Sequence, residues 1–452
     1  MKIVLTGATG FVGKAVLADL AIQGYEIIGL TRRRENLANL PCQAVECDMS
    51  KSNSGKLAEV LKGADVIIHL AGEPVAAAKW TDATKKRIRS SRIESTRSIV
   101  DALGFLPKDL RPKTFICASA IGLYGNRGDE WLSEESPPGE GFLSEVVRDW
   151  EDQARKADAL GIRTVLLRIG IVLGRNGGAL EKMVPVTLGS GQQWMSWIHL
   201  EDLVRFVRHA IQNSEVVGPY HLVAPNPVRN KEFTQELGRS QNLPAVMGAP
   251  AFALRAVLGE MASIVLDSAR VSSEKIQKSG FQFRFGTLAE ALADLKGGLR
   301  GHERRFSAMQ FVPKPIDQVF DFFSQAENLE KITPPWLGFQ ITGKSTPQIQ
   351  NHTLIDYKLK IHGVPVRWKT RIEDWSPNSQ FVDTQLAGPY KKWHHTHRFF
   401  PVPGGTLMTD EVVYELPVGI LGSWVAGAWV RNDVKKIFQY RTQVIARTFQ
   451  PE

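Results

Sequence analysis

Three glycines near the start of the chain have the spacing that holds a phosphate group. Gly7, Gly10 and Gly13 form a G-x-x-G-x-x-G turn between an apolar segment and a helical pattern. Glycine lets the backbone approach a pyrophosphate, whose charge is stabilised by the free N–H groups of a helix start. A plain glycine turn is the alternative, but the flanking strand and helix favour a nucleotide site. The expected contacts are Gly7, Thr9, Gly10, Phe11, Val12 and Gly13.

The residues after the second apolar segment indicate which dinucleotide is bound. An NAD site usually has an acidic residue there, which bonds the ribose 2′-hydroxyl. This chain has Thr31 followed by Arg32, Arg33 and Arg34. Because guanidinium groups bind phosphate bidentately, we expect Thr31, Arg32 and Arg33 to hold the 2′-phosphate of NADP(H). A solvated charge run is the alternative. Asp48 is expected to accept a hydrogen bond from the adenine amino group.

The elements that must position these residues change character along the chain. Up to about residue 300, short apolar segments alternate with helical patterns, which predicts βαβ units and an α/β domain with a doubly wound parallel sheet. The later segments alternate polar and apolar residues and end in a helix, which predicts an α+β domain with an antiparallel sheet. Residues 301–452 contain 21 Phe, Trp and Tyr, whereas residues 1–300 contain 18. We therefore expect domains at 1–299 and 305–452, joined by a linker at 300–304.

Composition narrows the function classes. The 452 residues have a net charge of +9 that is spread along the chain, and no nucleic-acid-binding signature is present. The odd count of three cysteines, Cys42, Cys47 and Cys117, and their lack of paired spacing argue against a disulfide framework. No signal peptide is evident, and the longest uncharged run near the end, residues 416–430, is shorter than the roughly 18–20 residues that span a bilayer. We expect a soluble, cytoplasmic protein with no nucleic-acid partner and no membrane span.

Further motifs along the first 300 residues are shared with a known family. They are residues 69–72, 119–125, 142–151, 168–174 and 196–202. With the glycine turn, they make the first 300 residues resemble an atypical extended short-chain dehydrogenase/reductase of the epimerase-like branch. The resemblance implies a Rossmann domain with a smaller substrate-binding portion, and it suggests a homodimer. It also implies that Ser119 lies next to the nicotinamide and adds these cofactor-binding residues: Leu70, Ala71, Gly72 and Arg168.

The catalytic pair of that family is missing. A Tyr-x-x-x-Lys pair lets the lysine lower the pKa of the tyrosine, so that the phenol can exchange a proton with the substrate. Here the two positions fall on Leu143 and Val147, or on Phe142 and Val146 in the neighbouring register. The remaining candidates for catalysis are Ser119, Tyr124 and His199. Packing is the alternative role for Tyr124, and a hydrogen-bonded structural role is the alternative for His199.

The second part of the chain resembles the helix-grip family, which is also called START-like or polyketide-cyclase-like. The resemblance is carried by residues 306–311, 315–323, 328–335, 393–399 and 410–417. It implies a curved antiparallel sheet around a long C-terminal helix, with an apolar cavity that binds a hydrophobic ligand. His395 and His397 share one face of a strand and His394 lies on the other. Because no third ligand is evident near this pair, no metal site is predicted.

Two functions from different classes fit these observations. The first is an NADP-dependent oxidoreductase or epimerase that acts on a small molecule with an apolar part. The second is a non-catalytic NADPH sensor, whose cofactor occupancy is read out through the attached ligand-binding domain. The intact cofactor turn supports both functions, and the missing tyrosine and lysine weaken the first.

Overall fold

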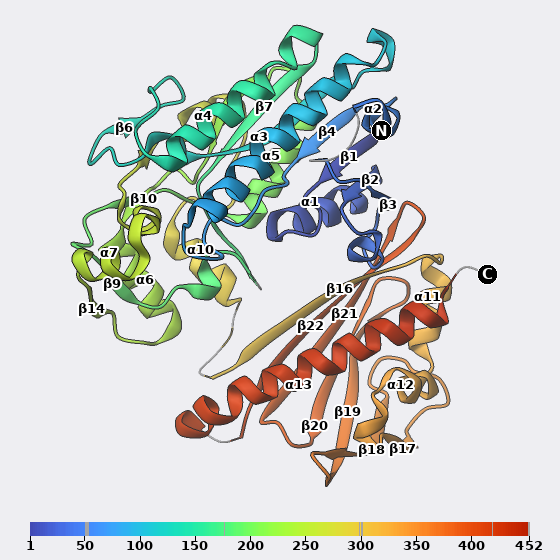
Figure 1. Ribbon diagram of the computed structural model, residues 1–452. Helices are drawn as coiled ribbons and strands as arrows, with labels where there is room; N and C mark the ends of the chain where they lie inside the picture. The colour runs from blue at the N-terminus through green and yellow to red at the C-terminus, as the bar shows by residue number, and fades with distance from the viewer. Residues whose placement is uncertain (50–53, 176, 298, 300–301, 418, 451–452) are drawn as a thin grey trace. The chain divides into compact units, whose positions relative to one another are not determined.

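The computed structural model describes residues 1–49, 54–175, 177–297, 299, 302–417 and 419–450, and it divides into two compact units near residue 298 (Figure 1). Of the predicted linker, Arg300 and Gly301 lie outside the described residues. Among the helices that are described, none has both the length and the apolar character needed to cross a membrane.

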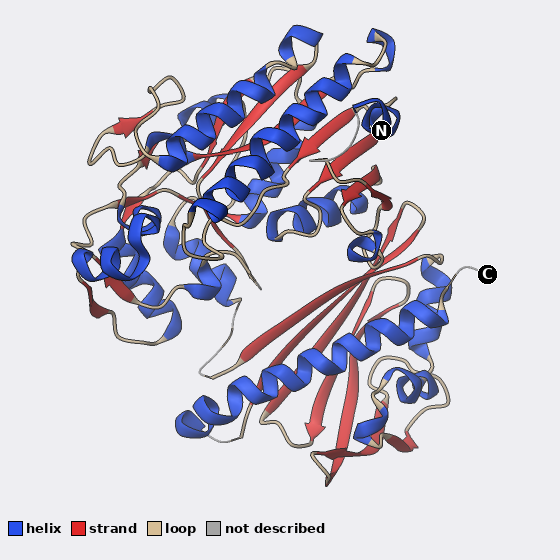
Figure 2. Cartoon of the chain, viewed as in Figure 1, coloured by secondary structure: helices blue, strands red, loops and turns tan. Residues whose placement is uncertain are grey.

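A seven-stranded parallel sheet organises the first unit (Figure 2). Its strands, in spatial order, are β12 (Gly218–Leu222), β7 (Arg163–Ile169), β5 (Thr114–Ala120), β4 (Val66–His69), β1 (Lys2–Thr6), β2 (Glu26–Thr31) and β3 (Gln43–Glu46). From β1 the chain adds β2 and β3 on one side, and from β4 it adds β5, β7 and β12 on the other side. The topological switch point of the sheet therefore lies between β1 and β4. In such sheets, ligands bind beyond the carboxyl ends of the strands at that point. The predicted doubly wound Rossmann fold is confirmed.

Helices lie between most consecutive strands of this sheet, because a crossover between parallel strands usually takes a helix; β2 and β3 are joined by a short 3-10 turn instead. The helices of the first unit are α1 (Phe11–Ile22), α2 (Ser54–Leu61), α3 (Asp82–Gly104), α4 (Phe142–Arg155), α5 (Leu200–Gln212), α6 (Asn230–Gln241), α7 (Ala251–Leu258), α8 (Ser263–Leu266), α9 (Glu274–Lys278) and α10 (Leu288–Lys296). Apolar side chains from α2, α3 and α4 pack with those of the strands into one buried core.

Short strands outside the main sheet build the smaller portion of this unit. They are β6 (Trp131–Leu132), β8 (Ile171–Leu173), β9 (Val186–Leu188), β10 (Trp194–Met195), β11 (Trp197–His199), β13 (Val228–Arg229), β14 (Val246–Ala249) and β15 (Arg270–Val271). A separate apolar cluster, which includes Trp197, Phe233 and Phe285, packs α6 and α10 together.

An antiparallel seven-stranded sheet and a 30-residue helix form the second unit. The strands, in spatial order, are β16 (Arg304–Val312), β22 (Gly405–Glu415), β21 (Lys392–Val402), β20 (Gln380–Ala387), β19 (Val364–Ser376), β18 (Leu354–Ile361) and β17 (Gln340–Lys344). The helices are α11 (Ile316–Ser324), α12 (Ala326–Ile332) and α13 (Gly419–Thr448). Helix α13 lies along the sheet (Figure 1), so the predicted helix-grip fold is confirmed.

Candidate functional site

The glycine turn after β1 has no room for side chains. Gly7 has φ +74°, and a Cβ there would lie 2.6 Å from the carbonyl carbon of Leu70. A Cβ on Gly13 would lie 2.1 Å from the carbonyl oxygen of Gly7. The Gly10 N–H closes the turn by donating to that same oxygen at 2.9 Å. Since α1 begins at Phe11, the free N–H groups of its first turn lie at this bend, and the cradle fits a pyrophosphate.

The predicted arginines extend the cradle beyond the end of β2. Arg32 and Arg33 are exposed, and within the part of the chain that the structure describes their guanidinium groups make no hydrogen bond or ion pair. Arg34 differs, because its Nε donates to the carbonyl oxygen of Ala44 at 3.2 Å. The Thr31 hydroxyl donates to the carbonyl oxygen of Arg33 at 3.1 Å and fixes the backbone there. Two of the three guanidiniums are therefore available to a phosphate.

The other predicted cofactor residues follow the neighbouring strands. Asp48 is half-buried after β3, and Leu70 and Ala71 are half-buried after β4, followed by the exposed Gly72. Thr9 is exposed, whereas Phe11 and Val12 are half-buried at the start of α1. The Phe11 ring packs against three glycines of the segment after β8, where added Cβ atoms would come within 2.7 Å of it: Gly174, Gly177 and Gly178.

Sequence reasoning included His69 in a family motif but gave no role to this buried histidine, which fixes the segment after β4. His69 Nδ1 lies 2.7 Å from the Thr6 hydroxyl and His69 Nε2 lies 3.1 Å from the Ser95 hydroxyl. The Ala71 N–H in turn donates to the Thr6 hydroxyl at 3.3 Å. This chain of hydrogen bonds ties β1, β4 and α3 together at the predicted cofactor edge. Its signal in the sequence was a polar residue at the end of an otherwise apolar strand.

His69 is expected to make stability depend on pH. Burial lowers the pKa of His69 to about 3 from an ordinary 6.5. The unfolded chain therefore takes up a proton below pH 6.5 that the folded chain does not, and stability falls with decreasing pH between about 6.5 and about 3. The expected contribution of His69 to the slope is about 1.4 kcal/mol per pH unit. Burial lowers the pKa of His221 to about 3 as well, so that histidine adds a separate contribution. Urea unfolding at several pH values should show the slope reduced by the contribution of His69 in His69→Gln and unchanged in the exposed-site control His302→Gln.

The predicted catalytic residue Ser119 belongs to a buried polar network below the sheet edge. Its hydroxyl donates to Glu151 Oε1 at 2.5 Å, and both side chains are almost fully buried. Glu151 is bound bidentately by Arg168, with both N–O distances at 2.8 Å. Burial would raise the pKa of Glu151, but the hydrogen bonds and charge of Arg168 outweigh it and hold that pKa below its ordinary value. Glu151 is therefore a carboxylate that positions Ser119.

Tyr124 and Arg168 also point into this network. Tyr124 is fully buried, and its hydroxyl lies 2.7 Å from an Arg168 nitrogen and 2.5 Å from His221 Nε2. Burial raises the pKa of Tyr124. These surroundings favour the packing role that the sequence left open for Tyr124. Arg168 was predicted among the cofactor-binding residues, but its guanidinium is engaged by Glu151, Tyr124 and the Glu134 carbonyl oxygen, which favours a structural role.

His199 caps a helix. Its Nδ1 accepts a hydrogen bond from the Glu201 N–H at the start of α5, so Nδ1 carries no proton. Its Nε2 lies 3.4 Å from Asp294, and burial lowers the pKa of the ring. The structural alternative suits His199 better than proton transfer.

The two positions of the missing catalytic pair lie on α4. Leu143 is half-buried and Val147 is buried, and Val147 packs with Tyr124. Helix α4 therefore presents apolar side chains at both positions.

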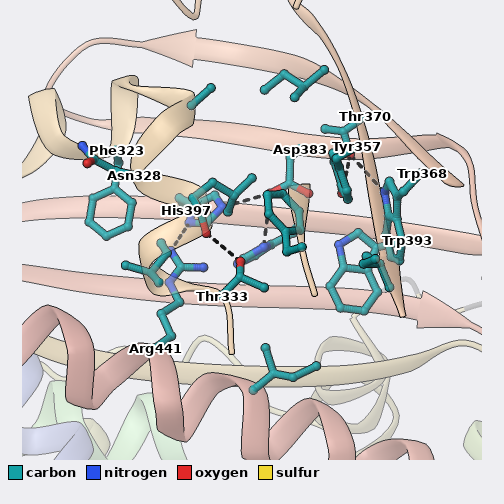
Figure 3. A pocket seen from close by; sticks show the side chains of 18 of the residues that line it. Phe323, Asn328, Thr333, Tyr357, Trp368, Thr370, Asp383, Trp393, His397 and Arg441 are labelled. Atoms are coloured by element: carbon teal, nitrogen blue, oxygen red, sulfur yellow. Dashed lines mark hydrogen bonds and ion pairs between the residues drawn. The ribbon is translucent and has the colours of Figure 1, made fainter. Parts of the chain in front are cut away.

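A cavity of about 190 Å³ lies within the second unit, lined by the sheet and by α12 and α13 (Figure 3). Aromatic rings form much of its wall, and Trp368 contacts both Trp393 and Tyr357 with ring centroids 5.5 and 5.8 Å apart. His395 and His397 line the same cavity, as their shared strand face predicted.

The expectation that no third ligand lies near this histidine pair is wrong. Asp383 on β20 pairs directly with His395 on β21. Asp383, His395 and His397 place one ligand atom each within 4.8 Å of one another. The single-strand pattern could not show this neighbour, because it comes from the adjacent strand.

Family comparisons agree with this division of the chain. Residues 3–223 match the NAD dependent epimerase/dehydratase family, and residues 249–295 match a domain of unknown function, DUF1731. Residues 312–438 match the family described as polyketide cyclase / dehydrase and lipid transport.

Several proteins are similar to the first unit. The chain is 36% identical over 299 residues to the chloroplastic homologue of epimerase family protein SDR39U1 from Arabidopsis thaliana, covering 65% of this chain and 86% of that protein. It is 35% identical over 302 residues to epimerase family protein YfhF from Bacillus subtilis, covering 65% and 98%. Human SDR39U1, crystallised with NADPH, superimposes with a TM-score of 0.59 at 28% identity, covering 66% of this chain and 100% of that one. A nucleoside-diphosphate sugar epimerase from Corynebacterium glutamicum gives a TM-score of 0.54 at 33% identity, covering 66% and 58%.

Proposed function

Because the chain belongs to the epimerase family that contains SDR39U1, we propose that it binds NADP(H) and acts as an oxidoreductase or epimerase on a small molecule. The observation that carries this proposal is the combination of a glycine cradle with two unengaged guanidiniums, Arg32 and Arg33. The NADPH complex of human SDR39U1 supports the same cofactor here.

Each part of the cofactor has candidate residues. Gly7, Gly10 and Gly13 would receive the pyrophosphate, Arg32 and Arg33 the 2′-phosphate, and Asp48 the adenine. Leu70, Ala71 and Gly72 would lie beside it. When bound, the nicotinamide supplies hydride-transfer chemistry. Ser119 is the hydroxyl predicted near that ring, and Glu151 and Arg168 fix its orientation from below.

The cofactor proposal predicts a selective loss of NADPH affinity. In Arg32→Ala/Arg33→Ala, we expect NADPH to bind roughly 10–100-fold more weakly, because two charge-assisted contacts to the 2′-phosphate disappear. NADH affinity should stay nearly unchanged. Arg34→Ala is the matched control, since its guanidinium is engaged by Ala44. Fluorescence titration measures both cofactors, and equal losses for NADPH and NADH would remove the argument for a 2′-phosphate site.

A non-catalytic NADPH sensor is the second candidate function. It is favoured by the apolar Leu143 and Val147 at the positions of the catalytic pair and by the burial of Tyr124. Native mass spectrometry of the purified chain distinguishes an oxidoreductase from a sensor, and NMR of the released small molecule detects an epimerase, whose product has the same mass as its substrate. A co-purified second small molecule whose mass changes by two hydrogens on addition of NADPH or NADP⁺ would establish the oxidoreductase. Cofactor without any turnover would favour the sensor, and the same spectra test the predicted homodimer.

For the second unit, the proposed role is to bind a hydrophobic small molecule. The aromatic lining of the cavity supports this role, because burial of apolar surface against such rings is favourable. This ligand would be the substrate of an enzyme or the signal of a sensor.

A further inference from the structure

One wall of the cavity holds a compact group of ionisable side chains that the proposed cofactor chemistry does not use. Asp383 Oδ2 lies 3.2 Å from His395 Nδ1 and 3.1 Å from His397 Nε2. Figure 3 shows Asp383 and His397 side by side in the pocket, with Trp368 and Trp393 beyond Asp383. Distances of this size separate neighbouring ligand atoms around one metal ion, because metal–nitrogen and metal–oxygen bonds are about 2.0–2.2 Å long.

A second carboxylate lies behind both imidazole rings. Asp410 Oδ1, on β22, is 2.9 Å from His395 Nε2 and 2.9 Å from His397 Nδ1. Metal-bound histidines typically donate their other ring N–H to a carboxylate, which fixes the tautomer. When Asp410 accepts hydrogen bonds from both N–H groups, the remaining lone pairs of both rings face Asp383. Three acceptor atoms then converge on one point, which a metal cation can occupy; the competing occupant is a proton shared with Asp383.

Charge balance agrees with a bound cation. Arg441 of α13 lies 3.3 Å from Asp410 Oδ1 and compensates one carboxylate. With both rings neutral, the two carboxylates and one guanidinium leave a net charge of −1. The pair His395 and His397 is almost fully buried. An uncompensated charge in such surroundings is costly, so the cluster needs a positive partner, which is either a metal ion or a proton on one of the two rings.

We propose that Asp383, His395 and His397 bind a divalent transition-metal ion whose open coordination positions face the apolar cavity. Two imidazoles and one carboxylate form a ligand set of the catalytic type, which leaves positions for water or a ligand. A divalent ion changes the net charge of the cluster from −1 to +1. An anionic oxygen on the ligand would balance it, so the cavity suits an apolar molecule that carries a carboxylate, enolate or phenolate.

Titration of the chelator-treated full-length chain with Zn²⁺ and Co²⁺ tests this site. We expect one tight site per chain and visible ligand-field absorption of the bound Co²⁺. Asp383→Asn and His397→Gln should lose the site, and Asp410→Asn should weaken it roughly 10–100-fold. The matched control is His394→Gln on the opposite face of β21, which should bind metal like the wild type. Circular dichroism checks that each variant is folded.

X-ray absorption of the Zn²⁺-loaded wild type keeps the test decisive if the buried variants do not fold. Two imidazoles with oxygen ligands at about 2.0–2.2 Å support the site, whereas sulfur ligation would assign the metal to cysteines and overturn it. The proposal also fails if the wild type binds no metal. In that case protons fill the cluster, and His397 Nδ1 accepts from Arg441 at 3.2 Å. None of these outcomes depends on NADP(H) binding.

Discussion

Replacement of Glu151 by alanine is expected to lower the free energy of unfolding of the first unit by about 3–5 kcal/mol, because it leaves a buried guanidinium without its carboxylate. The side chains of Glu151 and Arg168 are only 5% and 6% exposed, and they form a bidentate ion pair. The same substitution removes the acceptor of the Ser119 hydroxyl. Equilibrium urea unfolding of the full chain, fitted for each transition, measures the loss.

Arg155→Ala is the matched control for this loss. Arg155 binds the same carboxylate, with a nitrogen 3.0 Å from Glu151 Oε2, but its side chain is 42% exposed. Solvent screens such a pair, so the expected cost is about 0–1 kcal/mol. Glu151→Gln separates shape from charge, since it keeps an acceptor for Ser119 and loses the ion pair. Similar losses of unfolding free energy in Glu151→Ala and Arg155→Ala would show that the buried ion pair stabilises the fold no more than the exposed one.

The sequence predicted the local structure on which the proposed nucleotide site depends. The glycine turn and the helix after it are found where the spacing placed them, because short-range rules within one βαβ unit determine both. The role of the arginines after Thr31 stays a prediction. The network around Ser119 was harder to predict. Glu151 lies on α4 and Arg168 on β7, and only the packing of that helix on the sheet brings them together. Family motifs contained both residues but gave no sign that they would pair.

The metal-ligand cluster shows a second limit of sequence reasoning. Alternation along one strand placed His395 and His397 on the same face, but Asp383 comes from the neighbouring strand. The pairing of β20 with β21 sets Asp383 opposite His395 and Phe381 opposite His397. The two residues of each pair are the same number of positions before and after Pro389 in the sequence. A hairpin turn predicted at Gly388-Pro389 would have provided that register. Without a predicted turn, the register of the two strands was unknown, and Asp383 could not be identified as the neighbour of His395.

The glycine cradle allows a second large effect to be predicted. In Gly13→Ala, we expect NADPH affinity to fall by roughly 100-fold or more, equivalent to about 2.8 kcal/mol. The added Cβ would lie 2.1 Å from the Gly7 carbonyl oxygen and 3.0 Å from the Ala8 Cα. Both obstacles are backbone atoms, which cannot rotate away as a side chain could, so the turn has to open. An open turn separates the phosphate-binding N–H groups from the start of α1.

Gly104→Ala provides the control for this substitution, because a Cβ at that position at the end of α3 would meet no atom within 4 Å. It should bind NADPH like the wild type. Fluorescence titration gives the affinities, and thermal unfolding shows whether the Gly13→Ala chain is still folded when its affinity is measured. A folded Gly13→Ala variant with wild-type affinity would mean that the cofactor phosphates do not contact this turn. The pyrophosphate would then have to bind elsewhere along the switch point between β1 and β4, and the argument for the arginines after β2 would lose its geometric basis.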